Sequence, residues 1–97
     1  MTLLLGIATL VAASHEPYIA PEVRRDDVPQ ITAAIRRITP DPIITISALE
    51  SLKWPHHIDP DLVMVRTCCR TDITGDGFKL QKRAGRWVVT WKGTWIR

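Results

Sequence analysis

The hydrophobic pattern of this chain changes its period at Pro40-Asp41-Pro42, and that change limits the possible fold more than any other feature. After the turn, apolar and polar residues alternate from Ile44 onward, as in a half-buried strand. Before the turn, apolar residues recur every three or four positions, the spacing of one helix face: Ile31, Ala34, Ile35 and Ile38. Because the two prolines cannot continue a helix, we expect a helix that ends here and is followed by a sheet.

The expected helix has signals at both of its ends. Asp26 or Asp27 precedes it, where a carboxylate can accept hydrogen bonds from the free N–H groups of the first turn. Pro29 falls in that first turn, where its missing N–H costs little. Arg36 and Arg37 lie at the opposite end, which favours positive charge. The apolar helix face should be buried against the sheet.

Four strands are expected after the turn. They cover 44–49 (extending toward Trp54), 62–70, 78–83 and 86–96. A loop is expected over 54–61 and an Asp/Gly-rich turn over 72–77. Between the last two strands, Gly85 suits a positive φ, and Ala84 in place of Asn or Asp favours a bulged, slightly longer turn. The predicted fold class is α+β, with one N-terminal helix packed on a four-stranded antiparallel meander in a single domain over 26–97.

The first fourteen residues contain no charged side chain and are typical of a secretory signal peptide. Their apolar run ends in Ala12-Ala13-Ser14, small residues that suit cleavage, and it is too short to span a bilayer as a helix. We therefore expect 1–14 to be removed, 15–25 to form an extended arm or linker, and the protein to be secreted or periplasmic without a stable membrane span. The alternative is that 1–14 form a buried first strand or helix of the domain.

The C-terminal third carries a hairpin pattern. Its parts are Gly77-Phe78-Lys79-Leu80-Gln81-Lys82, Gly85-Arg86-Trp87-Val88-Val89 and Trp95-Ile96. This pattern resembles the closing hairpin of small secreted bacterial proteins of NTF2-like or cystatin-like build. The resemblance covers 62–97 and implies an α+β fold and, for the NTF2-like build, a cavity for a small ligand or substrate. One short helix stands here in place of the longer helices that wall such a cavity.

The motifs that carry chemistry are weak. There is no Gly-x-Ser-x-Gly elbow, phosphate loop or dinucleotide fingerprint. The segment 72–77 copies the opening of an EF-hand loop, but Arg83 occupies the position of its bidentate glutamate. The neighbouring side chains of His56 and His57 point to opposite sides of an extended chain and cannot easily share one ion. We expect no enzyme activity, no cofactor and no metal site.

Cys68 and Cys69 are adjacent in an expected strand. Neighbours in a regular strand face opposite ways, so we expect one cysteine in the core and the other on the outer face. The alternatives are a redox-active vicinal pair or an intermolecular disulfide.

Three tryptophans recur every four residues in the last strand, and this spacing predicts that Trp87, Trp91 and Trp95 share one face. In one interpretation the rings cover the helix and form the core, because three large exposed rings would make an apolar patch that soluble monomers rarely tolerate. In the other, the rings are a platform on which sugar rings or bases stack, beside Arg86 and Lys92.

The charge of the chain is uneven. Residues 1–61 carry 5 basic and 8 acidic side chains, a net charge of −3, whereas 62–97 carry 8 basic and 2 acidic ones, a net charge of +6. The first expectation is an exported, non-enzymatic binding or accessory module, including an inhibitor of a partner protein. The alternatives are an NTF2-like carrier or enzyme with a cavity, and a binder of an anionic polymer or glycan through the basic, Trp-containing hairpin. Export makes nucleic acid the less expected polymer.

Overall fold

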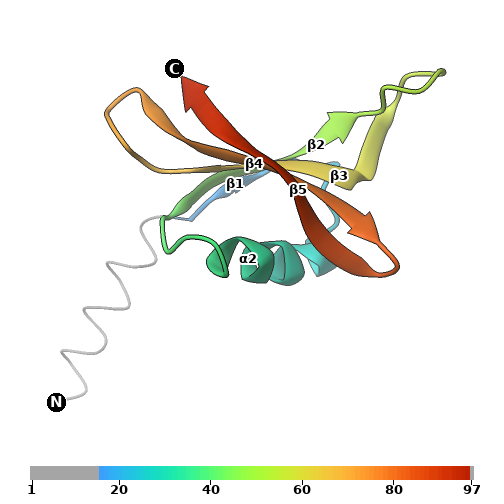
Figure 1. The fold of residues 1–97 in the computed structure, drawn as a ribbon. Coiled ribbons are helices and arrows are strands. Elements are labelled where there is room, and N and C mark those ends of the chain that lie inside the picture. Colours follow the sequence, from blue (N-terminus) through green and yellow to red (C-terminus); the bar gives the residue numbers. More distant parts are fainter. Residues whose placement is uncertain (1–15, 97) are drawn as a thin grey trace, which may run out of the picture.

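The computed structural model describes residues 16–96, which fold into a twisted sheet with a helix across one face (Figure 1). The predicted signal peptide, 1–14, lies outside the described residues. The elements in chain order are β1 (Tyr18–Ile19), the 3-10 turn η1 (Arg25–Asp27), α2 (Val28–Arg36), β2 (Ile43–Glu50), β3 (Ile58–Thr67), β4 (Thr74–Arg83) and β5 (Arg86–Ile96). Within 16–96, no helix has the length and apolar character needed to cross a membrane.

The predicted fold class is wrong in its topology. The sheet has five strands in the order β1-β2-β3-β4-β5, and β1 pairs with β2 in parallel, so the sheet is mixed and the helix follows a strand. The coarser expectation of an α+β protein with a sheet is confirmed. Two-residue β1 is too short to show an alternating pattern. It is held by pairing at Tyr18 and Ile19 and by the Ala20 N–H, which donates to the Ile46 carbonyl at 2.9 Å.

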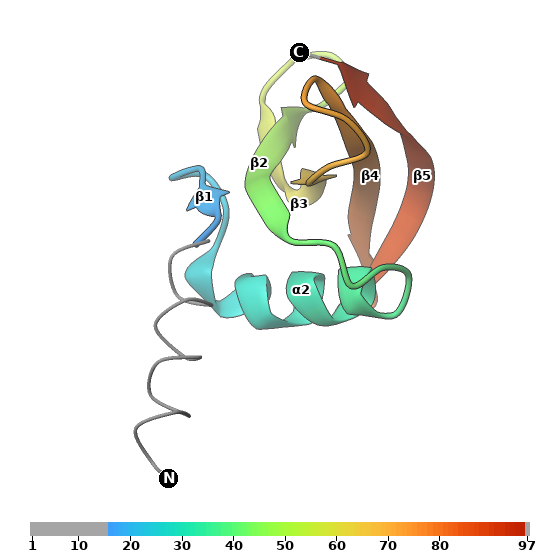
Figure 2. The same ribbon diagram turned by 90° about the vertical axis from the view of Figure 1, so that its left-hand side faces the viewer.

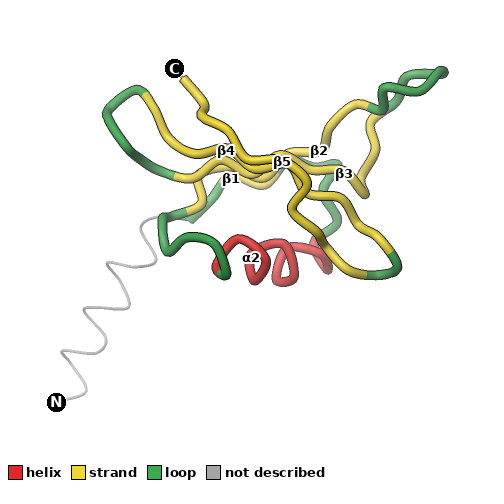
Figure 3. The backbone as a smooth tube through the Cα atoms, in the orientation of Figure 1, coloured by secondary structure: helices red, strands yellow, loops and turns green. Residues whose placement is uncertain are grey.

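The other four strands run antiparallel in chain order, and their ends differ from the prediction. The loop between β2 and β3 covers 51–57, because Asp59 already pairs with Leu49. β4 begins at Thr74, so Gly75 and Gly77 lie inside a strand. Only β5 has the predicted bounds, 86–96. Figure 3 shows both long hairpins, β2–β3 and β4–β5, extending beyond the layer formed by the sheet and α2.

The core lies between α2 and the sheet. The fully buried side chains include Ile31 and Ile35 of the helix and Ile46, Val63, Val65, Phe78 and Leu80 of the sheet. Figure 2 shows α2 lying across the strands on this side. Ile38 is 45% exposed, contrary to expectation, because the helix ends at Arg36. The Arg36 guanidinium donates to the carbonyls of Thr39 at 3.2 Å and Asp41 at 2.6 Å, which holds the turn after the helix.

The helix begins differently from the predicted aspartate cap. Asp27 occupies the N-cap position, but its side chain makes no capping hydrogen bond. Its buried carboxylate accepts a hydrogen bond from Lys82 Nζ of β4 at 3.0 Å and lies 3.6 Å from Arg24 Nη1. Arg24 also bonds Asp61 of β3 at 2.5 Å. The aspartate therefore ties the start of α2 to the sheet.

This contact sets the charge state of Asp27. Burial by itself would raise the pKa of Asp27, but the Lys82 ammonium, the Trp87 indole and the Arg24 guanidinium outweigh it and hold the pKa below its ordinary value of 3.8. Asp27 Oδ2 and Trp87 Nε1 are both buried, and neither atom makes a hydrogen bond.

The reversal between β4 and β5 is tighter than predicted. Arg83 pairs with Arg86, which leaves only Ala84 and Gly85 in the turn. Both residues have positive φ, 50° and 75°. This is the conformation of a two-residue type I′ turn, whose twist matches that of the strands it joins. Ala84 therefore adopts a left-handed conformation that favours Gly or Asn.

Candidate binding face of the sheet

A β-bulge in β5 decides which tryptophans face which side. Lys82 pairs with Trp87, and Leu80 pairs with Val89. The next pair joins Lys79 to Trp91, so Thr90 is the extra residue. The Thr90 hydroxyl donates to the carbonyl of Lys79 at 3.3 Å. Because a bulge inserts one residue into the alternation, side chains after it point to the opposite face from the one expected.

The bulge separates the three rings, so the prediction that they share a face is wrong. Trp87 belongs to the core and is only 7% exposed. Trp91 lies on the face of the sheet that α2 leaves uncovered and is 43% exposed. Trp95, four residues further on, lies on that same face and is half-buried. We call this uncovered side the open face.

Glycines beneath the rings let the indoles lie against the sheet. A Cβ at Gly77 would meet the Trp91 ring at 3.7 Å, and a Cβ at Gly93 would overlap it. A Cβ at Gly75 would come within 2.6 Å of the Trp95 ring, whose Nε1 donates to the Thr67 carbonyl at 2.8 Å. Trp91 therefore sits over a glycine floor with nearly half of its surface in solvent, while Trp95 is fixed by a hydrogen bond.

The open face carries positive charge next to these rings. Lys79 pairs with Trp91, and its Nζ lies 5.1 Å from the ring centroid, within the range of a cation–π contact. Arg66 pairs with Gly77 and is exposed. The other side chains that pair across this face in line with Arg66 and Lys79 are uncharged: Tyr18, Thr45, Ser47 and Met64. The face around Trp91 is therefore basic and aromatic.

A shallow hollow of about 210 Å³ adjoins Trp95 on this face. It is lined by Ile44, Thr45, Arg66, Trp95 and Ile96. These residues come from β2, β3 and β5, although β2 and β5 are not neighbours in the sheet. The sheet is therefore curved enough for β2 and β5 to border the same hollow, and the Arg66 guanidinium is part of its lining.

The structure does not bring all of the predicted binding residues together. Lys92 pairs with Phe78, which is on the helix side, and its Nζ lies 5.9 Å from that ring. Arg86 stands at the hairpin end and lines a groove beside α2. Arg66 and Lys79 take their place beside Trp91 and Trp95. The sequence signal for them was available, because both alternate with buried positions in their strands.

Cys68 and Cys69 form a disulfide with each other. The prediction that one lies in the core and the other on the outer face is wrong, because β3 ends at Thr67 and the pair follows the regular strand. Cys69 is exposed, Cys68 is half-buried, and the Cys68 N–H donates to the Pro42 carbonyl at 2.8 Å. Redox activity of this pair stays a prediction.

The histidine pair and the Asp/Gly-rich segment, which the sequence offered as candidate metal sites, make local contacts in a loop and a strand. His56 lies 3.6 Å from Glu50, and His57 Nδ1 lies 3.0 Å from the Pro55 carbonyl oxygen. Asp76 is buried and pairs with Arg70 at 3.1 Å. Across residues 16–96, no three His, Cys, Asp or Glu side chains gather closely enough to hold a metal ion.

Comparison with known proteins gives no significant match, whether to a protein-family model, to a curated protein or to a solved structure. The resemblance to NTF2-like and cystatin-like hairpins stays a prediction.

Proposed function

We propose that the protein is a non-enzymatic binding module that holds an acidic polysaccharide on the open face of its sheet. The observation that carries this proposal is the position of Trp91, which is 43% exposed over a glycine floor beside Lys79. A flat indole offers its face to the C–H groups of a sugar ring, and a neighbouring cation offers a partner to a uronate or sulfate group.

The distribution of aromatic rings supports a glycan rather than a nucleic acid. Proteins that bind single strands without sequence preference usually stack successive bases on several aromatic side chains. On the described open face, the widely exposed rings are Trp91 on β5 and Tyr18 on β1, which lies at the opposite edge of the sheet. The Trp95 indole is half-buried, and its N–H is already bonded to Thr67. Arg66 lines the hollow near Trp95, where its guanidinium can bind an anionic group of the ligand.

The filled core supports binding at the surface rather than in an internal cavity. The largest fully buried side chain, Phe78, packs with the helix residues Ile31 and Ile35 and with Leu80 between α2 and the sheet. The hollow beside α2 and the hollow at Trp95 are both open to solvent. A protein built in this way offers faces for a polymer more readily than a chamber for a small substrate.

The test measures binding to heparin and to a polyuronate by isothermal titration calorimetry. Trp91→Ala and the double variant Arg66→Gln/Lys79→Gln should each weaken binding, and added salt should weaken binding of the parent protein because the contacts are ionic. The matched controls are Trp54→Ala, which removes an 86% exposed ring on the β2–β3 loop, and Arg25→Gln/Lys53→Gln, which removes two exposed charges elsewhere.

Three results would overturn the proposal. They are absence of binding by the parent protein, unchanged binding by Trp91→Ala, and tighter binding of oligothymidine than of either polysaccharide. The third result would assign the open face to single-stranded nucleic acid.

Export belongs to the same proposal and rests on the uncharged residues 1–14. The mass of the protein recovered outside the cytoplasm should match a chain that begins near His15, and an intact Met1 there would contradict cleavage.

A further inference from the structure

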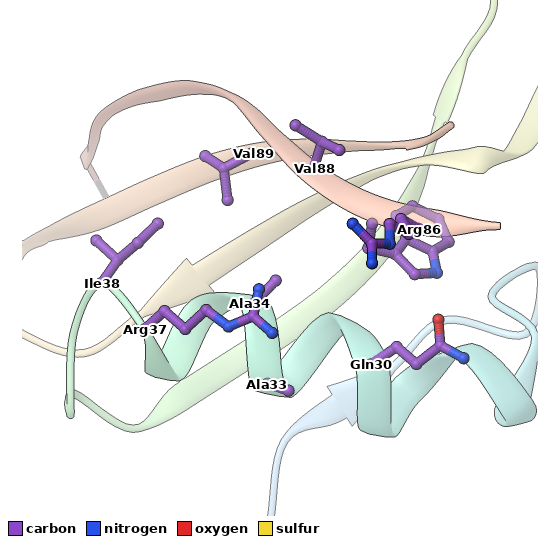
Figure 4. A pocket seen from close by; sticks show the side chains of 9 residues that line it. Gln30, Ala33, Ala34, Arg37, Ile38, Arg86, Val88 and Val89 are labelled. Atoms are coloured by element: carbon purple, nitrogen blue, oxygen red, sulfur yellow. The ribbon is translucent and has the colours of Figure 1, made fainter. Parts of the chain in front are cut away.

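A second hollow lies on the opposite side of the sheet, between α2 and the first half of β5. It has a volume of about 550 Å³ and is open along one side (Figure 4). The groove runs beside the helix from Gln30 to Arg37, roughly 10 Å at the rise of an α-helix. Figure 4 shows the helix and β5 as its two walls, with Val89 directed toward the helix.

The groove is apolar, and apolar side chains also line its borders. Ala34 and Trp87 are buried at the base. Ile38 on the helix side is 45% exposed, and Val89 on the strand side is half-buried. Branched aliphatic side chains on both walls thus keep part of their surface in water, although each would gain by contact with another apolar group. This arrangement suits a ligand with a hydrocarbon chain.

The charged side chains that line the groove indicate which chemical group the other end of that ligand carries. Arg37, just after α2, and Arg86, at the start of β5, line it from opposite walls, and none of the lining side chains is acidic. Neither guanidinium forms an ion pair with a described carboxylate. An exposed arginine next to apolar surface binds a carboxylate through charge-assisted hydrogen bonds.

From these observations we infer that the groove between α2 and β5 binds a free medium-chain fatty acid, with its alkyl chain against Ala33, Ile38 and Val89 and its carboxylate at Arg37 or Arg86. This site is separate from the open face, which lies on the other side of the sheet.

The experiment uses the full chain and titrates decanoate below its micelle concentration by calorimetry, with decyltrimethylammonium as a cationic ligand of the same chain length. Decanoate should bind and decyltrimethylammonium should not. Arg37→Gln/Arg86→Gln should weaken decanoate binding roughly ten-fold or more, the loss expected when a charge-assisted contact is removed. Arg25→Gln/Lys53→Gln, which lowers the net charge equally, should leave it unchanged.

A steric variant tests the location of the site. Ala33 is exposed on the helix, and Leu is nearly as good a helix former, so Ala33→Leu should fill the groove without lowering the melting temperature. It should abolish decanoate binding, whereas Trp91→Ala should leave it intact. The inference is overturned if the parent protein does not bind decanoate, if the cationic ligand binds as well, or if Ala33→Leu or Arg37→Gln/Arg86→Gln binds like the parent.

Discussion

At the scale of single residues, two tryptophans of β5 differ in how deeply they are buried. Trp87 is buried under α2, whereas Trp91 lies on the open face over Gly77 and Gly93. A buried ring contributes its full transfer free energy and leaves a cavity when it is removed. A half-exposed ring contributes roughly half of that burial and leaves no enclosed cavity.

Two alanine variants should show this difference in stability. Trp87→Ala should lower the free energy of unfolding by about 3 to 5 kcal/mol, as for other buried aromatic residues. Trp91→Ala should lower it by roughly 1 to 2 kcal/mol, because the ring keeps nearly half of its surface in water. Urea unfolding of both variants provides the measurement, and equal losses would contradict the assignment of the two rings to different faces.

At the scale of elements, the hairpin β4–β5 closes through a strained residue. Ala84 has a φ of 50°, which costs an L-residue with a Cβ roughly 1 kcal/mol. Asn tolerates this conformation far better and is typical of the first position in a type I′ turn. The hairpin therefore folds in spite of its turn sequence, through the long pairing of β4 with β5.

Ala84→Asn should stabilise the protein by about 0.5 to 1 kcal/mol, since it relieves the left-handed conformation without touching the core. The measurement is the denaturant midpoint relative to the parent protein. A matched substitution that introduces Asn outside the turn, Ala33→Asn on the helix surface, should be neutral or destabilising. A loss of stability in Ala84→Asn would show that the turn has another conformation.

The elements with a strong local period could be predicted from the sequence, and the exceptions have physical causes. The helix face with Ile31 and Ile35 follows from periodicity, and the bounds of β5 follow from its aromatic and β-branched residues after the Ala84-Gly85 turn. β1 could not be found, because two residues carry no period. The faces of Trp91 and Trp95 were missed because one extra residue, Thr90, reverses the alternation, and no single-residue signal marks it. The outward position of Lys79 could be predicted from its apolar neighbours Phe78 and Leu80, but its place beside Trp91 could not, because the bulge determines it.

At the scale of the whole molecule, Asp27 connects three parts of the fold. Its carboxylate meets Lys82 of β4 and Arg24, and Arg24 continues to Asp61 of β3. The folded protein holds the pKa of Asp27 below the ordinary value of 3.8. Between those two values the unfolded chain binds more protons than the folded one, so stability rises with pH.

The contribution of Asp27 is therefore fully present above about pH 4 and is lost as the pH falls through the folded pKa. Asp27→Asn should be less stable than the parent at neutral pH, because Lys82 loses its charged partner. The difference in urea midpoint between variant and parent should narrow as the solution is acidified. A constant difference from neutral to strongly acidic pH would contradict the lowered pKa.

The bulge at Thr90 also has an evolutionary consequence. The core residues of β5, Trp87 and Val89, come before the bulge, and the open-face tryptophans, Trp91 and Trp95, come after it. Under the proposed function, substitutions at the open-face positions of the second half of the strand change ligand binding and leave the core residues of the first half in place. Within the eleven consecutive residues of β5, selection on the proposed binding face and selection on the core therefore act on different side chains.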